Sequence, residues 1–252
     1  MKIRLDRLLV ERALAKSRER AQALILAGKV LVQEQKLDKA GASVEQDAAI
    51  RLLGEDLRYV SRGALKLEHA LHVWAIDVTG RTCMDVGAST GGFSDCLLQH
   101  GATRVIAVDT GYGQIDMKLR QDARVRLLER TNARYLTPDA IGEPVSFVAI
   151  DVSFISATLV LPAVLAAAFP VASPDQQVVV LVKPQFEVGR EAVGKGGIVR
   201  DREAQAAAVE KVRAALTALG WTSADPIESP ILGMEGNREF LLFARRPTPA
   251  PW

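Results

Sequence analysis

Residues 82–93 read TCMDVGASTGGF, an apolar run that passes directly into a glycine-rich turn. The run has the composition of a buried strand, and the residues after the turn continue with helical spacing. A strand, a glycine turn and a helix in this order are typical of the first βα unit of a doubly wound sheet, which binds ligands at the carboxyl ends of its strands. The dinucleotide fingerprint G-x-G-x-x-G would require a glycine at position 89, where Ser89 stands. The stretch therefore predicts an open α/β sheet with a ligand site at the turn, and it disfavours a nicotinamide dinucleotide.

The same alternation of strands and helices continues toward the C-terminus. Further strands are predicted at 105–109, 125–128, 147–151 and 178–183, and helices near 92–100, 113–121, 158–169 and 201–219. Such alternation implies parallel strands joined by crossover helices, so we expect a doubly wound, Rossmann-like α/β domain over residues 59–246. Segments 222–227 and 240–245 are compatible with a terminal hairpin, and a Pro-rich tail follows at 247–252.

Residues 1–58 form a second predicted module, a small α+β domain. Leucines at helical spacing open a first helix, Ser17 is a candidate N-cap for a second, and Gly28 is placed to end that helix. Short strands are expected to follow at 30–32, near Val44 and at 49–52. Residues 1–36 hold 9 basic and 4 acidic side chains, whereas the whole chain has a net charge of only +2. This uneven charge indicates either a nucleic-acid anchor beside a nearly neutral domain or a basic solvated surface.

The composition argues against several classes of protein. Cys83 lies in an apolar strand-like run and Cys96 in a helical one, so we expect buried reduced thiols and no disulfide framework. The three histidines show no metal-ligand spacing with them, and we expect no metal site. Charged residues interrupt every N-terminal apolar run, and no apolar stretch reaches the roughly 20 residues of a membrane span. These features are typical of a cytoplasmic protein.

Polar side chains end three of the predicted strands. Asp109 ends the second strand, where a carboxylate can accept hydrogen bonds from both ribose hydroxyls of a nucleoside cofactor; the alternative is a simple turn residue. Asp151 ends the fourth strand and Lys183 the fifth. Because these strand ends face the same edge of the sheet, Asp151 and Lys183 can meet at one site although 32 residues separate them. A positioned base or cation of this kind activates weak nucleophiles such as hydroxyls, although most Asp and Lys residues are solvated surface groups.

Both modules resemble known families. The run RLDRLLVERALAKSRERAQALILAGKVLV at 4–32 resembles the RNA-binding domain named for ribosomal protein S4, although Gln33-Glu34 replaces the usual Asn-Gly of its hairpin. The turn DVGASTGGF at 85–93 is similar to the S-adenosylmethionine loop of FtsJ-like ribose methyltransferases. Further motifs match the family known as TlyA, in order: SRG-x-x-KL at 61–67, DVSF at 151–154, KPQFE at 183–187, GKGGIVRD at 194–201 and GNREF at 236–240. The resemblance extends from Leu5 to about Phe243.

The resemblance implies an enzyme that uses S-adenosylmethionine to methylate the 2′-hydroxyl of a cytidine in ribosomal RNA. It implies a catalytic tetrad of Lys66, Asp151, Lys183 and Glu239. In this tetrad Lys183 acts as the general base, or as the cation that holds the 2′-oxygen, and Asp151 orients it. The implied cofactor-binding residues are Asp85, Gly87, Ala88, Ser89, Gly91, Gly92, Phe93, Asp109 and Asp151. The predicted RNA-binding residues of the first module are Arg4, Arg7, Lys16, Arg18, Arg20 and Lys29.

Several alternatives remain at this point. Members of the family are sometimes labelled haemolysins, but no membrane-length helix, strongly amphipathic helix or barrel pattern is visible. A second alternative is an RNA-binding protein without catalytic activity, but such a protein would not need the tetrad and the glycine-rich turn. A third is a methyltransferase that modifies a base, but the two lysines of the tetrad favour a ribose oxygen as the methyl acceptor. Relatives with short termini, like those of this chain, tend to modify only the large ribosomal subunit, which we take as the expected substrate. We also expect a monomer.

Overall fold

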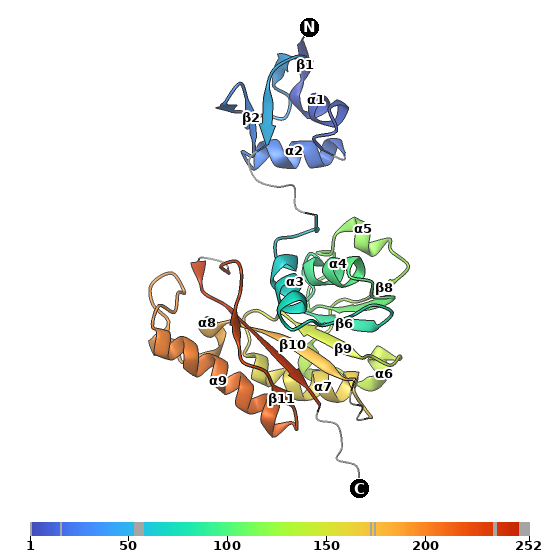
Figure 1. Cartoon of the computed structure of the whole chain (residues 1–252), viewed down its shortest axis with the longest axis vertical. Coiled ribbons are helices and arrows are strands. Elements are labelled where there is room, and N and C mark those ends of the chain that lie inside the picture. The colour runs from blue at the N-terminus through green and yellow to red at the C-terminus, as the bar shows by residue number, and fades with distance from the viewer. Residues whose placement is uncertain are drawn as a thin grey trace. The chain divides into compact units, whose positions relative to one another are not determined.

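A computed structural model describes residues 2–15, 17–52, 58–171, 173, 175–233 and 236–246 of the chain. The chain divides into two compact units, Met1–Arg58 and Tyr59–Trp252 (Figure 1). Each unit has its own hydrophobic core, so each is described by itself.

The N-terminal unit packs two short helices against small antiparallel sheets. Its elements are β1 (Lys2–Arg4), α1 (Leu5–Glu11), α2 (Arg18–Leu26), β2 (Val30–Val32), β3 (Gln35–Lys36), β4 (Ser43–Glu45) and β5 (Ile50–Leu52). Strand β1 pairs with β4, and the other three strands form a sheet in the order β3-β2-β5. The Ser17 hydroxyl accepts a hydrogen bond from the Arg20 N–H at 3.2 Å, and Gly28 has a φ of +64°. The predicted start and end of α2 are therefore confirmed.

The C-terminal unit is built on one mixed sheet with the strand order β11-β13-β10-β9-β6-β7-β8, in which β12 also pairs with β13. Its strands are β6 (Thr82–Val86), β7 (Arg104–Val108), β8 (Val125–Leu128), β9 (Phe147–Ile150), β10 (Gln177–Val182), β11 (Thr222–Ser223), β12 (Ile227–Glu228) and β13 (Phe240–Arg245). Strands β6 to β10 run parallel, whereas β13 runs antiparallel to β10. Because β6 lies between β7 and β9, the chain switches sides at this strand, and such switch points open a ligand crevice at the carboxyl edge.

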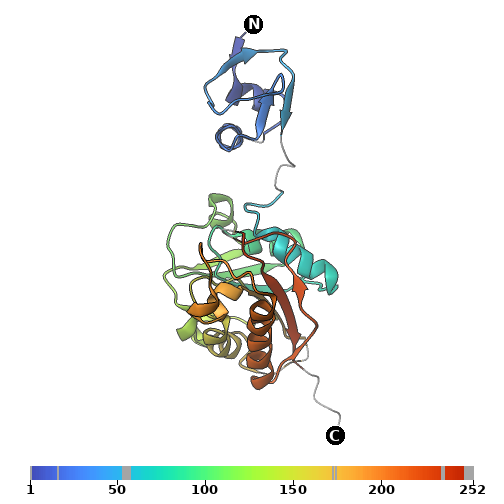
Figure 2. The same cartoon turned by 90° about the vertical axis from the view of Figure 1, so that its left-hand side faces the viewer.

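Helices cover both faces of this sheet. They are α3 (Ala64–Val73), α4 (Gly92–Gln99), α5 (Met117–Arg120), α6 (Pro138–Ile141), α7 (Leu161–Ala168), α8 (Pro184–Glu187) and α9 (Arg202–Ala218), with single 3₁₀ turns η1 (Ala133–Tyr135), η2 (Ala157–Leu159) and η3 (Arg190–Ala192). Helices α3 and α4 lie on one face, and α7 and α9 on the other (Figure 1, Figure 2). Leu67 and Leu97 belong to the hydrophobic core on the α3 and α4 side of the sheet, and Val164 and Leu216 belong to the core on the α7 and α9 side. The predicted doubly wound α/β fold is confirmed.

Several predicted boundaries change in the structure. The helix expected over 113–121 shortens to α5, because Asp116 caps it by accepting from the Lys118 N–H at 2.9 Å and Gly113 has a φ of +71°. The segment that begins at Thr222 pairs antiparallel with β13, as the predicted terminal hairpin requires, but this arm is interrupted and forms two short strands, β11 and β12. Asp109, Asp151 and Lys183, which were predicted to end strands, are instead the first residues after β7, β9 and β10. Both cysteines are buried and free, as expected.

Candidate active site

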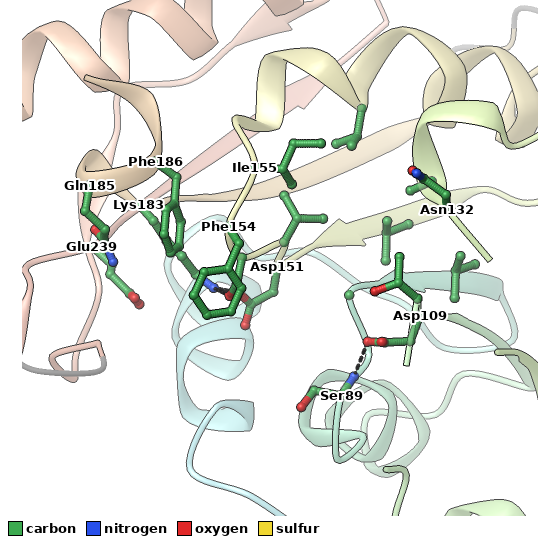
Figure 3. A pocket seen from close by; sticks show the side chains of 18 of the residues that line it. Ser89, Asp109, Asn132, Asp151, Phe154, Ile155, Lys183, Gln185, Phe186 and Glu239 are labelled. Carbon is green, nitrogen blue, oxygen red and sulfur yellow. Dashed lines mark hydrogen bonds and ion pairs between the residues drawn. The ribbon is translucent and has the colours of Figure 1, made fainter. Parts of the chain in front are cut away.

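The carboxyl ends of the parallel strands surround a pocket of about 840 Å³. Small-ligand sites typically measure roughly 300–1,000 Å³. Figure 3 shows Ser89 and Asp109 on one side of the pocket and Asp151, Lys183 and Glu239 on the other. One cavity therefore joins the glycine-rich turn to the polar residues that follow β9 and β10.

The glycine-rich turn packs closely against the loop that follows β9. Gly87 has a φ of +87°, and a Cβ at this position would lie 2.3 Å from the carbonyl oxygen of Asp151. Ser89 also lies in the left-handed region, with a φ of +49°, and its N–H donates to Asp109 Oδ2 at 2.8 Å. This hydrogen bond ties the turn after β6 to the end of β7, so the backbone of the turn forms one wall of the pocket.

A smaller cavity of about 160 Å³ adjoins the same turn. Among the predicted cofactor residues, Asp85, Ala88, Gly92 and Phe93 line this cavity, while Gly87, Ser89 and Asp151 line both cavities. Gly91 is not part of the lining of either cavity; its φ is +92°, and a Cβ there would lie 2.2 Å from the Leu119 side chain. The residues predicted to bind a cofactor thus line two adjoining cavities, and Gly91 supports the turn by close packing.

Asp85 contributes a fully buried carboxyl group to the smaller cavity. Its Oδ2 accepts from both the N–H and the hydroxyl of Ser94, at 2.9 and 2.7 Å, whereas Oδ1 has no hydrogen-bond partner among the described residues. Burial, together with the nearby negative charge of Asp151, raises the pKa of Asp85 to about 7, although the hydrogen bonds from Ser94 act in the opposite direction. A buried oxygen without a partner beside a cavity is a group that a ligand can satisfy.

Asp109 presents its carboxylate to the larger pocket directly after β7. Besides the Ser89 N–H, it accepts from the Gly111 N–H at 2.6 Å, so backbone bonds hold both of its oxygens. A carboxylate offers about four acceptor positions. Asp109 therefore keeps the capacity to accept from two hydroxyl groups of a ligand.

Lys183 and Asp151 form an ion pair where β10 and β9 end. The Lys183 Nζ lies 2.6 Å from Asp151 Oδ1 and donates to the Ser153 hydroxyl at 2.7 Å. An ammonium group has three N–H donors. These two contacts therefore leave one donor of Lys183 for a third oxygen. Ser153 was not among the predicted site residues: the motif DVSF contains it, but nothing in the motif indicates which side chain meets a lysine 30 residues away.

Lys66 and Glu239 form a second ion pair in the same pocket. Lys66 lies on α3 and Glu239 directly precedes β13, and the Lys66 Nζ lies 2.5 Å from Glu239 Oε2. The two residues are only 8% and 2% exposed. The four residues of the predicted tetrad are thus brought together from four separate elements as two ion pairs.

An aromatic pair borders the pocket beside Lys183. Phe154 is 88% exposed and has a φ of +64°, an uncommon backbone conformation for a bulky residue. Its ring centroid lies 5.4 Å from that of Phe186, and both rings lie next to the Asp151–Lys183 pair (Figure 3). Phe154 was not among the predicted site residues. An exposed aromatic ring on a strained backbone points to a functional contact.

In the N-terminal unit, a buried carboxylate organises part of the basic surface. Asp6 is fully buried and accepts from Arg4 Nη2 at 2.9 Å, Arg18 Nε at 3.0 Å and Gln22 Nε2 at 2.9 Å. The hydrogen bonds from Arg4 hold the pKa of Asp6 far below its usual range. Both arginine side chains remain more than half exposed, at 52% and 55%. Asp6 therefore holds two predicted RNA-binding arginines near one point of the surface.

The other predicted RNA-binding residues have different surroundings. Arg7 pairs with Glu11 at 2.8 Å on the exposed side of α1. Arg20 and Lys29 are half-buried, and Lys16 lies outside the described residues. Arg12, which we did not predict, donates hydrogen bonds to the backbone carbonyls of Gln46 and Ala48 and so supports the unit itself.

The described residues contain no cluster of three or more His, Cys, Asp or Glu side chains that could hold a metal ion. Within the same ranges, no helix combines the length and the apolar character of a membrane span.

Comparison with known proteins gives consistent matches over both units. Residues 59–246 match the FtsJ-like methyltransferase family and residues 3–50 match the S4 domain. The chain is 48% identical to the 16S/23S rRNA (cytidine-2′-O)-methyltransferase TlyA of Mycobacterium tuberculosis, over 97% of this chain and 90% of that protein. It is 37% identical to Hemolysin A of Brachyspira hyodysenteriae, over 95% and 98% of the two chains. A solved structure from Streptococcus thermophilus that carries a hemolysin name is 44% identical, covers 99% of this chain and 90% of its own, and superimposes with a TM-score of 0.74.

Proposed function

Because the chain belongs to the FtsJ-like methyltransferase family and carries an S4 domain, we propose that it methylates the 2′-hydroxyl of a cytidine in ribosomal RNA. The observation that carries this proposal is the pocket itself. Lys66, Asp151, Lys183 and Glu239 line the same cavity as Asp109 and the glycine-rich turn. A methyl donor and a hydroxyl acceptor can therefore be held within reach of one another.

The residues around the turn fit S-adenosylmethionine as the methyl donor. Asp109 would accept hydrogen bonds from the two ribose hydroxyls, since its carboxylate keeps free acceptor positions. Gly87 and Ser89 would face the cofactor with their backbone, and the unpartnered Oδ1 of Asp85 offers a further hydrogen bond in the adjoining cavity. When bound, the cofactor supplies an electrophilic methyl group.

The Lys183–Asp151 pair acts on the acceptor hydroxyl. A hydroxyl is a weak nucleophile, so the site has to orient its oxygen and take its proton. Lys183 has one N–H donor beyond its contacts with Asp151 and Ser153, and this donor holds the 2′-oxygen. As the oxygen gains a methyl group it loses its proton: Lys183 passes one N–H proton to the Asp151 carboxylate, 2.6 Å away, and takes the hydroxyl proton in its place. The Lys66–Glu239 pair supports the site from α3 and β13.

Phe154 is placed to receive the base of the target nucleotide. Sequence-specific RNA proteins commonly bind unstacked bases on aromatic side chains, and each stacked base contributes roughly 1–3 kcal/mol. Phe154 is exposed, borders the pocket and lies one residue beyond the Ser153 that contacts Lys183. A base on this ring would bring its own ribose toward the Lys183–Asp151 pair. The N-terminal unit would hold the surrounding RNA through its basic surface, including Arg4 and Arg18.

A Lys183→Ala variant tests the chemistry. We expect a loss of methyl transfer of about 10²–10⁴-fold, the usual effect of removing a positioned acid–base group. Cofactor affinity and the thermal unfolding transition should stay close to those of the parent, since Asp151 remains 21% exposed and can be solvated. Lys183→Arg should be nearly as damaging, because a guanidinium does not release its proton and is larger. A folded Lys183→Ala protein that methylates ribosomal RNA at the parental rate would refute the mechanism.

Mass mapping of ribosomal RNA tests the substrate. RNA from cells with and without the protein should differ by one methyl group on the ribose of a cytidine in one or both subunits. The same RNA from cells that carry only Lys183→Ala should match the sample without the protein. A methyl group on a base, or no difference in either subunit, would rule out this function.

A further inference from the structure

Glu187 ends α8 and makes contacts that the proposed reaction does not yet use. It belongs to the motif KPQFE, yet its carboxylate points away from the pocket lining and into the protein. The residue is 6% exposed. Its Oε1 accepts from the Ala157 N–H at 2.6 Å, and its Oε2 accepts from the Ser156 hydroxyl at 2.5 Å. Glu187 thus holds the end of the loop that begins at Asp151.

The loop 151–157 is held at both ends by the short segment 183–187. At the start of the loop, Lys183 contacts Asp151 and Ser153. At its end, Glu187 binds Ser156 and Ala157. In the middle, the Phe154 ring packs against Phe186. Contacts at three places along the loop therefore join two stretches that lie about 30 residues apart in the chain.

The middle of this loop is strained. Phe154 has a φ of +64° although it is a bulky residue with an exposed side chain. Such a conformation is strained for a bulky residue and persists only where its surroundings impose it. The ring itself constrains the backbone little, because it is 88% exposed and meets Phe186 at the border of the pocket. The constraint comes from the two fixed ends of the loop.

We propose that Glu187 is a positioning residue of the methyltransferase site. By fixing Ser156 and Ala157, it keeps Phe154 in the left-handed conformation and keeps Ser153 within reach of Lys183. It touches neither cofactor nor RNA and acts through the loop. This inference rests on the proposed function, because the loop matters only if Lys183 and Phe154 act on the RNA nucleotide.

Lys211 provides a way to separate this role from simple stabilisation. Its Nζ lies 3.4 Å from Glu187 Oε2 and also donates to the Glu187 backbone carbonyl at 2.7 Å. Lys211 lies on α9, and both of these contacts are with Glu187 and not with the loop. Removing Lys211 therefore removes the charge partner of Glu187 but leaves the two bonds from the loop in place.

The test compares single-turnover methyl transfer to ribosomal RNA, cofactor affinity and thermal unfolding across matched variants of the full chain. Glu187→Ala should slow transfer by about 10- to 100-fold, since a misplacement of about 1 Å at a reacting group costs on the order of 10²-fold. Its cofactor affinity should remain within about 2-fold of the parent, because Asp109 and the turn are unchanged. Glu187→Gln should keep most of the rate, because its amide oxygen can accept from Ala157 and its amide nitrogen can donate to Ser156.

Two controls address stability. Lys211→Met should methylate at a near-parental rate. Val212→Ala opens a cavity in the core beneath α9 but removes none of the hydrogen bonds between Glu187 and the loop, so it should lower the unfolding temperature without slowing transfer measured well below it. If Glu187→Ala does not fold, Ser156→Ala takes its place: it removes one of the two bonds and should still slow transfer several-fold.

A double-mutant cycle tests the route of the effect. If Glu187 acts by holding Phe154, then Glu187→Ala in a Phe154→Ala background should slow transfer much less than it does in the parent. Equal slowing in both backgrounds, or a parental rate for Glu187→Ala and Ser156→Ala, would overturn the inference. These outcomes differ from a failure of the proposed function, in which the parent protein itself transfers no methyl group to ribosomal RNA.

Discussion

The buried ion pair between Lys66 and Glu239 gives the sharpest prediction about stability. Its residues are 8% and 2% exposed, so truncating one of them leaves the other charge enclosed without a partner. Breaking such a pair typically costs about 3–5 kcal/mol. In a domain of this size each kcal/mol lowers the unfolding temperature by roughly 2–4 °C. We therefore expect Glu239→Ala to unfold about 6–20 °C below the parent.

Other variants of the pair should lower the unfolding temperature less than Glu239→Ala does. Glu239→Gln should be milder, because its amide oxygen still accepts a hydrogen bond from the lysine. Replacing both charges, as in Lys66→Met with Glu239→Leu, should restore most of the lost stability, since apolar residues of similar volume often substitute for a buried pair without net cost. Thermal unfolding of the full chain followed by circular dichroism measures these effects.

Activity measured on the same variants separates stability from catalysis. If both ion pairs serve the reaction, the charge-free double variant should regain its unfolding temperature but remain slow in methyl transfer. Glu239→Ala that unfolds within about 2 °C of the parent would refute the reasoning, because a buried lysine cannot lose its partner at so little cost. A double variant that methylates normally would limit this pair to a structural role.

Three further predictions concern single carboxylates. Asp109→Ala should weaken S-adenosylmethionine binding by about 1–3 kcal/mol in calorimetry, the cost of charge-assisted hydrogen bonds; unchanged affinity would place the ribose contact elsewhere. Asp85 has a pKa raised by burial to about 7, so the folded protein binds more protons than the unfolded chain between about pH 4 and 7. This raised pKa makes the parent lose stability as pH rises through that window, by up to about 4 kcal/mol, and Asp85→Asn should remove that part of the loss; parallel stability curves for the two proteins would contradict the assignment. Asp6→Ala frees the Arg4 and Arg18 side chains, so RNA binding then has to order both of them at a cost of about 0.5–1.5 kcal/mol per side chain. RNA affinity should therefore fall about tenfold. Unchanged affinity in a filter-binding titration would show that these arginines need no fixed position.

The fold was predictable from the sequence because its signals are local. The apolar runs of β6, β7, β9 and β10 and the capping residue Ser17 act on neighbouring residues, and the structure follows them closely. Where a predicted helix boundary was wrong, the cause was also local. The predicted helix over 113–121 has the right spacing, but Gly113 and Asp116 delay its start.

The candidate site was predictable only in part, because its contacts join distant residues. Topology alone places Asp151 and Lys183 at one edge, and their side chains do meet there at 2.6 Å. The roles of Ser153, Phe154 and Glu187 depend on rotamers and backbone angles that no spacing in the sequence encodes. Such residues stand inside recognisable motifs, yet only the structure distinguishes the ones that line the pocket from the ones that hold the loop.

The two ion pairs of the pocket differ in a way that fits a division of roles. The side chains of Lys66 and Glu239 are 10% and 3% exposed, whereas those of Lys183 and Asp151 are 10% and 21% exposed. A pair that binds a nucleotide oxygen and takes its proton has to be open to that nucleotide on one side, and only the second pair is. An enclosed pair cannot exchange its partner for a substrate group without a large desolvation cost. The partly exposed side chain of Asp151, beside the exposed ring of Phe154, therefore marks the side from which we propose that the RNA nucleotide enters, with the enclosed pair as the wall behind it.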